Sequence, residues 1–376
     1  MPSCASCTSK KKKIRCPDAD SVNILIVKTS AIGDVIHTLP ALNALRRKYP
    51  EARIDWLVEE AAADLVIGHT AIDTVLVSRR KAWVLDLKQG RVGVAWRGFA
   101  DFVRELRAIE YDLLLDFQGL LKSGIFVGLA RAKRKVGFGK GMEHAECSYL
   151  FLNESIPPVS MDQHAAIREL LLLKAIGIES EEIVFDLPVT DEQRETIGHL
   201  LADEGIDPAK PLVAINPMTT WETKHWRNDR FARVADQLID RGMAVVFSGG
   251  PQDVRGIEDI RAAMSGKAAS LAGRTTLKEL AALYEKVAVL ITTDTGPMHL
   301  AAAAGAPVVA LFGPTAPWRT GPFGEGHRIL RADIGCSPCL KRQCDRDHAC
   351  MTRITVDQVV QAAQAVLAGR QPQQKD

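Results

Sequence analysis

Short, wholly apolar segments recur along this chain, and longer segments with helical spacing separate them. The most apolar of them, residues 23–27 and 307–312, are much shorter than the ~18 residues that a membrane span needs. Their length and lack of polar alternation are typical of strands that are buried on both faces of a parallel sheet. Because parallel strands are joined by helical crossovers, this alternation constrains the chain to an α/β fold.

The alternation of strand and helix runs through two cycles. The first, from residue 21, predicts strands over 23–28, 54–58 and 113–117, and helices over 39–48 and 163–175. The second, from residue 211, predicts strands over 212–216, 244–248, 288–293 and 307–312, and helices over 229–241, 276–286 and 297–304. Two cycles of similar size favour two facing Rossmann-like domains with parallel sheets and a cleft between them.

These cycles predict the domain boundaries. We assign 21–188 to an N-terminal domain, 189–210 to a linker region with a helix over 191–204, and 211–354 to a C-terminal domain. Residues 355–376 are interpreted as a C-terminal helix and tail. Residues 1–20 are interpreted as a disordered basic tail, whose lysines 10–13 are either solvated charge or a means of attraction to an anionic membrane.

Composition excludes several classes of protein. With 376 residues, 47% of them hydrophobic, the chain is long and apolar enough for two packed cores, so a disordered chain is excluded. A formal net charge of +2 argues against a nucleic-acid partner. No apolar run of useful length follows the basic start, so we expect a cytoplasmic protein.

The strongest candidate site lies at residues 291–305, where a buried strand leads into an alanine-rich helix. Asp294 ends the strand, Thr295 can cap the helix, Gly296 allows a tight turn and Pro297 suits the first helical position. Met298 and His299 follow within the first turn. The free N–H groups at such a helix start favour a phosphate or pyrophosphate, although an ordinary turn with a surface histidine is the alternative.

Two further loops follow predicted strands, and parallel α/β sheets bind ligands at that end. After the first strand, Lys28 and Asp34 bracket a glycine-containing loop, in which Asp34 is either a helix cap or a general base. After residue 216, Thr219, Thr220 and Lys224 can hold phosphate oxygens, or the loop is a surface turn anchored by tryptophan.

Together the three segments resemble the signatures of glycosyltransferase family 9, the ADP-heptose:lipopolysaccharide heptosyltransferases. The segment Lys-Thr-Ser-x-x-Gly-Asp-Val-x-His-Thr-Leu-Pro at 28–40 is most similar to type I members, which add the first heptose to Kdo-lipid A. Residues 116–123 resemble the same members. The resemblance implies a GT-B fold and an inverting transfer of heptose from ADP-heptose to the Kdo of the inner core, without a catalytic metal or other cofactor. It also implies an enzyme that acts peripherally on the cytoplasmic face of the inner membrane.

The resemblance assigns roles by position. Asp34 corresponds to the general base, and Lys28, Ser30, Gln118 and Lys122 are expected on the acceptor side. The donor is expected to contact Thr219, Thr220, Lys224, Asp253, Asp294, Thr295, Gly296, Pro297, Met298 and His299. Asp253 stands where the family more often has a glutamate that holds the nucleotide ribose.

Two alternatives to this function stay open. One is a family-9 enzyme that acts later in core assembly, such as heptosyltransferase II or III. The other is a non-catalytic protein that binds a nucleotide or a metal.

A cysteine cluster lies near the C-terminus, at Cys336, Cys339, Cys344 and Cys350. This spacing could hold a structural zinc ion, but reduced thiols without a ligand and a disulfide are also compatible with it.

Overall fold

The computed structural model describes residues 22–143, 146–180 and 182–370. The segment expected to be a basic tail, 1–20, and the end of the expected C-terminal tail, 371–376, lie outside these ranges. In the described part of the chain, no helix combines the length and hydropathy needed to cross a bilayer.

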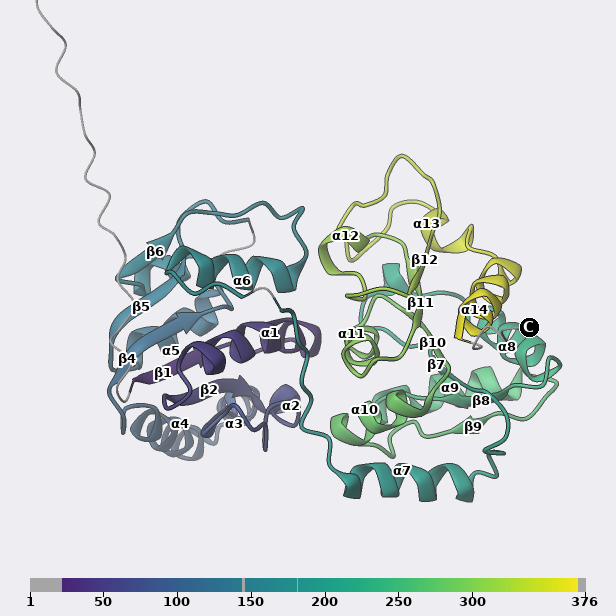
Figure 1. Cartoon of the computed structure of the whole chain (residues 1–376), viewed down its shortest axis with the longest axis horizontal. Coiled ribbons are helices and arrows are strands. Elements are labelled where there is room, and N and C mark those ends of the chain that lie inside the picture. Colours follow the sequence, from purple (N-terminus) through teal and green to yellow (C-terminus); the bar gives the residue numbers. More distant parts are fainter. Residues whose placement is uncertain (1–21, 144–145, 181, 371–376) are drawn as a thin grey trace, which may run out of the picture.

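The first domain is built on a parallel six-stranded sheet. Its strands are β1 (Asn23–Val27), β2 (Arg53–Glu59), β3 (Thr74–Ser78), β4 (Tyr111–Asp116), β5 (Ala132–Phe138) and β6 (Glu154–Ile156). Its helices are α1 (Ile32–Lys48), α2 (Glu60–Ala63), α3 (Arg80–Lys88), α4 (Val92–Leu106), α5 (Leu121–Leu129), the 3₁₀ helix η1 (Ser148–Phe151) and α6 (Ala165–Ala175). The strand order β3-β2-β1-β4-β5-β6 places β1, which leads to Asp34, near the middle of the sheet (Figure 1).

The second domain repeats this plan. Its strands are β7 (Leu212–Asn216), β8 (Ala244–Phe247), β9 (Ala269–Ser270), β10 (Val289–Thr293), β11 (Val308–Phe312) and β12 (Arg328–Arg331), in the order β12-β11-β10-β7-β8-β9. Its helices are α7 (Asp191–Asp203), η2 (Glu222–Lys224), α8 (Asn228–Ile239), η3 (Pro251–Asp253), α9 (Val254–Ala262), α10 (Leu277–Lys286), α11 (Gly296–Ala303), α12 (Pro317–Thr320), α13 (Ala349–Thr352) and α14 (Val356–Arg370). The predicted α/β class with two facing parallel sheets is confirmed.

Each central strand buries both of its faces, as the apolar segments predicted. In β1, Ile24 and Ile26 pack into the cluster that contains α1, whereas Leu25 and Val27 pack with Phe102 of α4 on the opposite side of the sheet. Because side chains alternate between the two faces of a strand, helices on both sides must cover it.

The two domains meet where α1 packs against α11 (Figure 1). Ile36 and Leu39 of α1 belong to the same buried cluster as Met298 and Leu300 of α11. The apolar core is therefore continuous from one domain into the other along these two helices.

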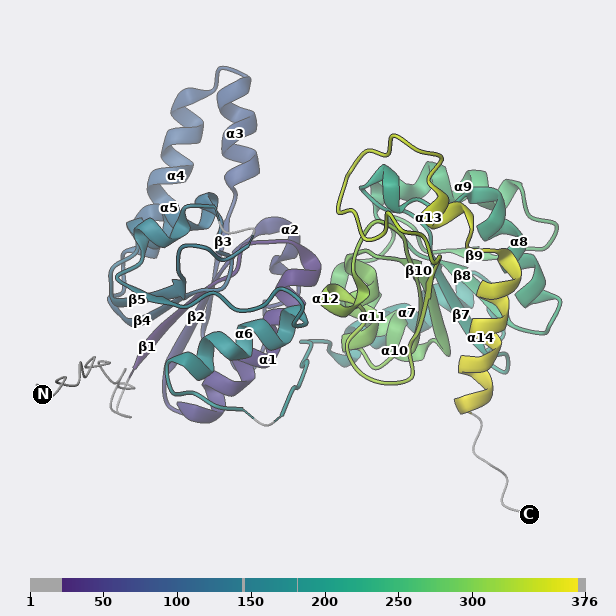
Figure 2. The same ribbon diagram turned by 90° about the horizontal axis from the view of Figure 1, so that it is seen from above.

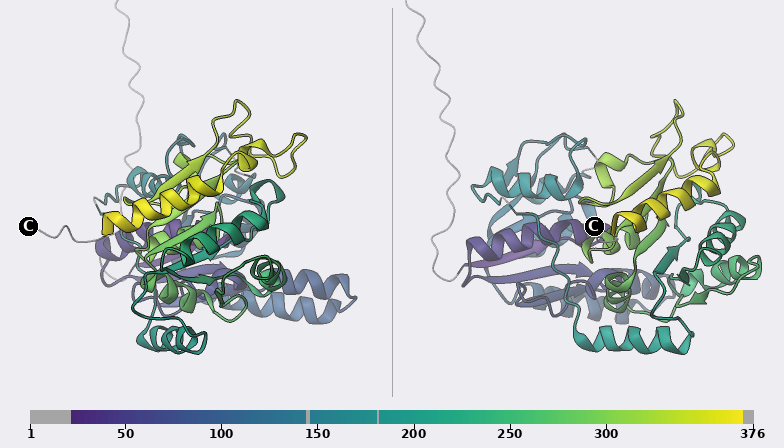
Figure 3. Two further views of the ribbon diagram at one scale, coloured as in Figure 1. Left: turned by 90° about the vertical axis from the view of Figure 1, so that its right-hand side faces the viewer. Right: turned by 45° about the vertical axis from the view of Figure 1, so that its right-hand side comes forward.

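The segment expected to link the domains, 189–210, carries α7, which packs against α10 of the second domain (Figure 1). Ile197 and Leu201 of α7 are buried in the same cluster as Leu280 of α10. At the other end of the chain, α14 packs against α8 and lies along the second domain (Figure 3).

One predicted boundary is wrong. The first helix was expected over 39–48 because proline favours a helix start, but α1 begins at Ile32 and contains Pro40 in its interior. Proline cannot donate the hydrogen bond that its position would otherwise make to Ile36. The buried side chains of Ile36, Leu39 and Leu42 nevertheless hold this helix in place. Asp34 consequently lies in the first helical turn and not in a loop.

Candidate active site

Asp34 is the third residue of α1, and the helix itself holds its carboxylate. Oδ2 accepts a hydrogen bond from the backbone N–H of Ala31 at 2.9 Å, and the hydroxyl of Thr38 donates to the carbonyl of Asp34 at 2.9 Å. Among the described residues no side chain hydrogen-bonds to Oδ1. The half-buried Asp34 is thus both a helix cap and a candidate base, and the two interpretations of the sequence do not exclude each other.

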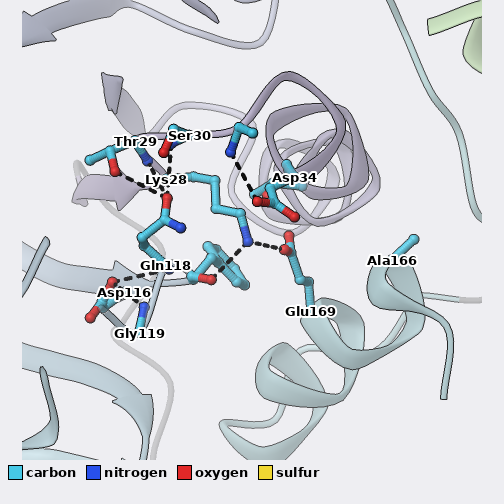
Figure 4. A network of polar contacts seen from close by, with 12 residues as sticks. Lys28, Thr29, Ser30, Asp34, Asp116, Gln118, Gly119, Ala166 and Glu169 are labelled. Carbon is cyan, nitrogen blue, oxygen red and sulfur yellow. Dashed lines mark hydrogen bonds and ion pairs between the residues drawn. The ribbon is translucent and has the colours of Figure 1, made fainter. Parts of the chain in front are cut away.

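Lys28 is buried and forms an ion pair with Glu169 of α6. Its Nζ lies 2.6 Å from Oε1 of Glu169 and donates to the carbonyl of Phe117 at 2.9 Å (Figure 4). Burial raises the pKa of Glu169, and the charge of Lys28 opposes this shift. Lys28, expected on the acceptor side, therefore joins β1 to α6 and β4.

Gln118 holds the loop that connects β1 to α1. Its Oε1 accepts from the backbone N–H groups of Thr29 and Ser30, each at 2.9 Å, and from the hydroxyl of Thr29 at 3.1 Å (Figure 4). Gln118 is itself held by Asp116, whose Oδ1 accepts from the N–H groups of Gln118 and Gly119 at 3.1 Å each. Burial raises the pKa of Asp116 to about 6.

Lys122 lies beside this loop. Its Nζ donates to the hydroxyl of Ser30 and lies 3.3 Å from Oε1 of Glu59, which also accepts from Arg80 at 3.1 Å. Ser30, Gln118 and Lys122, all expected on the acceptor side, are therefore together at the carboxyl ends of β1 and β4. Glu59, which lies at the end of β2, belongs to none of the motifs recognised in the sequence.

On the facing domain, Lys224 pairs with Asp294. Its Nζ lies 2.7 Å from Oδ2 of Asp294 and donates to the carbonyl of the same residue at 3.2 Å. It also lies 4.6 Å from the centre of the Trp221 ring. Lys224 does not lie on an exposed surface turn, because the Lys224 and Asp294 side chains are only 15% and 6% exposed.

The helix start at α11 differs from its prediction in two details. Thr295 occupies the N-cap position with extended backbone, but its side chain makes no capping hydrogen bond. Gly296 does not adopt a left-handed φ, so a tight turn is not the reason for this glycine. A Cβ there would lie 3.0 Å from Cβ of Ile32, so its small size allows α1 to approach. Pro297 lies in the first turn, as predicted.

Met298 and His299 point away from the solvent. Met298 is fully buried in the apolar core, so its side chain cannot reach a ligand in a cleft unless the core opens. His299 is 8% exposed, and its Nδ1 lies 3.1 Å from Nε2 of His37 in α1. Burial lowers the pKa of His299 to about 4, although Asp294 and Asp34 oppose this shift. The alternative of an ordinary turn with a surface histidine is therefore wrong.

His164 extends the contact between the domains. Its ring lies 5.0 Å from that of His37, its Nδ1 accepts from the N–H of Ala166, and its Nε2 lies 3.0 Å from the carbonyl of Gly321. Since a carbonyl can only accept, Nε2 carries the proton. Nearby, Trp318 donates to Asp162 at 3.2 Å, and the charged groups of Arg319 and Glu143 are 3.5 Å apart. These pairs lie too far apart in the sequence for any local pattern to reveal them.

The remaining donor-side candidates lie on loops that follow β7 and β8. Thr219 is half-buried and Thr220 is exposed, both after β7. Asp253 lies in η3 after β8, where its Oδ2 accepts from the N–H of Gly250 at 2.8 Å. With Asp294 after β10, these residues follow three adjacent strands of the sheet.

The cysteine segment packs against the donor-side loop. The hydroxyl of Thr223 donates to the carbonyl of Lys341 at 2.8 Å, and the Arg342 guanidinium lies 5.0 Å from the Trp221 ring. The four thiols, all reduced, range from exposed at Cys336 and Cys339 to buried at Cys350. Burial raises the pKa of Cys350, and the other three cysteines raise it further. Over the described residues, however, no group of three or more His, Cys, Asp or Glu side chains is arranged to hold a metal ion.

Comparison with known proteins identifies the family. The family model described as glycosyltransferase family 9 (heptosyltransferase) matches residues 99–350. The chain belongs to glycosyltransferase family 9. Membership in this family confirms the resemblance, and it identifies a glycosyltransferase with the GT-B arrangement of two Rossmann-like domains.

Relatives of this family-9 enzyme match over most of its length. The lipopolysaccharide heptosyltransferase 1 of Pseudomonas aeruginosa is 34% identical over 324 residues, which cover 86% of this chain and 87% of the relative. The Escherichia coli heptosyltransferase WaaC, solved with ADP, is 26% identical with a TM-score of 0.74, covering 92% of this chain and 100% of that structure. A family-9 enzyme from Veillonella parvula has a TM-score of 0.78 and covers 94% of this chain and 99% of that structure. Because it is only 24% identical, it supports the fold alone.

Proposed function

We propose that this enzyme transfers L-glycero-D-manno-heptose from ADP-heptose to the Kdo of the lipopolysaccharide inner core, with inversion at the anomeric carbon. One observation carries the proposal. The contact between α1 and α11 brings the Asp34 carboxylate of one domain to the helix start and the Lys224–Asp294 pair of the other. A candidate base and a candidate diphosphate site then lie on the two sides of the contact between the domains.

In this proposal Asp34 takes the proton of the attacking acceptor hydroxyl. Its Oδ2 is engaged with the N–H of Ala31, which orients the carboxylate and leaves Oδ1 for the proton. Attack from the side opposite to the departing ADP inverts the anomeric centre. Ser30, Gln118 and Lys122 line the same strand ends, where hydroxyl, amide and ammonium groups suit an acidic sugar such as Kdo.

The departing diphosphate gains negative charge as the glycosidic bond breaks. Lys224 has three N–H donors, and its two contacts with Asp294 leave one for a phosphate oxygen. The start of α11 adds backbone N–H groups that the Thr295 side chain does not cap. Because these groups offset the charge, we propose a transfer that requires no metal ion.

A structural zinc at Cys336, Cys339, Cys344 and Cys350 stays a hypothesis beside this mechanism. The described thiols influence the pKa of Cys350 but do not form a metal-binding group. No step of the transfer depends on them.

A direct test is a transfer assay with Kdo-lipid A and a panel of ADP-, GDP- and UDP-sugars. We expect turnover with ADP-heptose. Turnover only on an acceptor that already carries heptose would replace this proposal by a later family-9 reaction. Binding of ADP without any transfer would indicate a non-catalytic nucleotide-binding protein.

The proposed acceptor is anchored in a lipid bilayer, so we also propose that the enzyme works at the cytoplasmic face of the inner membrane, without spanning it and without a nucleic-acid partner.

A further inference from the structure

Helices α3 and α4 form a hairpin that projects from the first domain, to the side of the line that joins the two domains (Figure 2). Aromatic rings hold the two helices together, because the Trp83 ring lies 5.7 Å from Phe99 and 5.4 Å from Phe102. A Cβ at Gly98 would lie 2.8 Å from Nε1 of Trp83, so this glycine lets the indole pack closely. Phe102 in turn contacts Phe126 of α5, with ring centres 5.3 Å apart, which anchors the hairpin to the domain.

The outer part of this hairpin exposes large apolar side chains. Trp96 is 65% exposed, and the others are between 39% and 60% exposed: Val84, Leu85, Leu87, Val92 and Val94. They come from both helices and flank the turn at residues 89–91. A cluster of this kind on one projecting element is unusual for a surface that faces only water.

The same hairpin is rich in basic residues. Residues 79–98 contain six basic residues and one acidic residue, Asp86, which pairs with Arg91. In the described part of the chain no carboxylate pairs with Lys81, Lys88 or Arg97. Exposed apolar side chains that alternate with unpaired cations along one hairpin suit an interface that is apolar inside and anionic at its surface, which is the surface of an anionic bilayer.

The base of the hairpin lies next to the acceptor-side residues. Arg80, the first residue of α3, donates to Glu59 at 3.1 Å, and Glu59 lies 3.3 Å from Lys122, which donates to Ser30. A bilayer that binds the hairpin would therefore lie on the same side of the first domain as the acceptor-side residues.

We propose that the outer part of the α3–α4 hairpin, residues 84–97, docks on an anionic lipid bilayer and presents the acceptor-side residues to it. The hairpin inserts its apolar side chains at the level of the lipid headgroups, and its cations contact lipid phosphates. The inference rests on the proposed function for the nature of the acceptor, but bilayer binding can be measured without any transfer reaction.

The test uses the full chain and sedimenting vesicles of phosphatidylcholine, with or without phosphatidylglycerol. We expect binding to the anionic vesicles and little to the neutral ones. Leu85→Glu/Trp96→Glu should weaken this binding roughly a hundredfold, since two inserted apolar side chains are replaced by carboxylates. Ile329→Glu is the matched control, because Ile329 is 44% exposed on β12 of the other domain. It should bind as the wild type does.

Replacement of lysines 10–13 by glutamine separates the hairpin from the N-terminal lysine run. Binding that is lost only in this variant, or that is unchanged in Leu85→Glu/Trp96→Glu, would overturn the docking surface. The docking surface would also be overturned if the wild-type protein does not bind vesicles but forms a dimer, and the hairpin variant is monomeric. The exposed side chains would then contact a second copy of the chain.

Transfer assays then distinguish the two proposals. We expect the hairpin variant to retain its rate on a deacylated, water-soluble acceptor and to lose at least tenfold on an acceptor embedded in vesicles. Vesicle binding through the hairpin without heptose transfer would reject the proposed function and retain the docking surface. Normal transfer together with unimpaired vesicle binding in the hairpin variant would reject the docking surface and retain the proposed function.

Discussion

The imidazole of His299, in the first turn of α11, lies directly over Gly33 of α1. A Cβ at position 33 would lie 2.4 Å from Cδ2 of that ring, a distance that no packed side chain tolerates. The two residues are in different domains, and Gly33 immediately precedes Asp34. The glycine thus allows the candidate base to approach the donor-side helix.

Gly33→Ala should therefore force the two helices apart. Overpacking of this kind costs about 1–3 kcal/mol of stability, and the displaced Asp34 should reduce transfer more than tenfold. Urea unfolding and steady-state kinetics measure the two effects. His299→Ala in the same chain should restore much of the stability, because it removes the clashing ring. If Gly33→Ala/His299→Ala is as unstable as Gly33→Ala, the contact with the His299 ring is not the cause of the loss of stability.

Asp34→Asn should abolish most of the transfer and leave ADP binding unchanged. An amide keeps the size of the side chain but cannot take the proton of the acceptor hydroxyl, and loss of a general base typically costs ~10²–10⁴-fold. Turnover and ADP affinity are measured on the same preparation. A rate close to that of the wild type would exclude Asp34 as the base.

Lys224→Ala should reduce both kcat and stability, for separate reasons. A charged hydrogen bond to the leaving diphosphate is worth ~1.5–3 kcal/mol, so kcat should decrease roughly ten- to a hundredfold or more. Stability should decrease because the carboxylate of Asp294, which is 5% exposed, loses its partner.

The double variant Lys224→Ala/Asp294→Asn separates these two effects. It should recover stability, since no buried charge is left unpaired, while kcat stays low. Recovery of kcat together with stability would assign Lys224 a purely structural role. His299→Ala, whose ring contacts His37 and Gly33, should lower ADP affinity less than Lys224→Ala does.

Acidification should destabilise the contact between the domains. Burial holds the pKa of His299 at about 4, below its ordinary value of 6.5, so the unfolded chain binds the proton more readily. Stability is therefore fully present above pH 6.5 and decreases as the pH falls towards 4. Asp294 and Asp34 favour the protonated ring, whereas His164 and Lys224 oppose it.

A shift of one pKa unit corresponds to about 1.36 kcal/mol. His299 should therefore lower the free energy of unfolding at pH 5 by about 2 kcal/mol relative to its value above pH 6.5. Unfolding free energies measured between pH 7 and 5 test this, with His299→Gln as the comparison. The variant should show a shallower pH dependence, because glutamine does not titrate in this range. An identical slope in both proteins would assign the pH dependence to other groups, such as His37, whose pKa burial also lowers.

A short exposure to EDTA should leave transfer intact, because Lys224 and the start of α11 are proposed to offset the diphosphate charge. A strict requirement for Mg²⁺ or Mn²⁺ would contradict this prediction. Metal analysis of the purified protein tests the zinc hypothesis separately. If the cysteines hold zinc, prolonged chelation should lower the melting temperature slowly without an immediate loss of rate.

The sequence alone determined the α/β class, seven of the twelve described strands and the three loops that carry the site. Strand β7 was predicted with its observed bounds, and β1 and α10 to within one residue at each end. These features follow from local rules, since hydrophobic periodicity and turn chemistry act over a few residues. The motifs after β1, β7 and β10 were visible for the same reason.

Only the tertiary structure decided how those residues are used. Lys28 pairs with Glu169, 141 residues away, and His37 meets His299, 262 residues away. Local pattern could neither predict these partners nor reveal that Gly33 makes room for an imidazole of the other domain. Such contacts depend on the packing of α1 against α6 and α11, which the burial of many apolar side chains decides together.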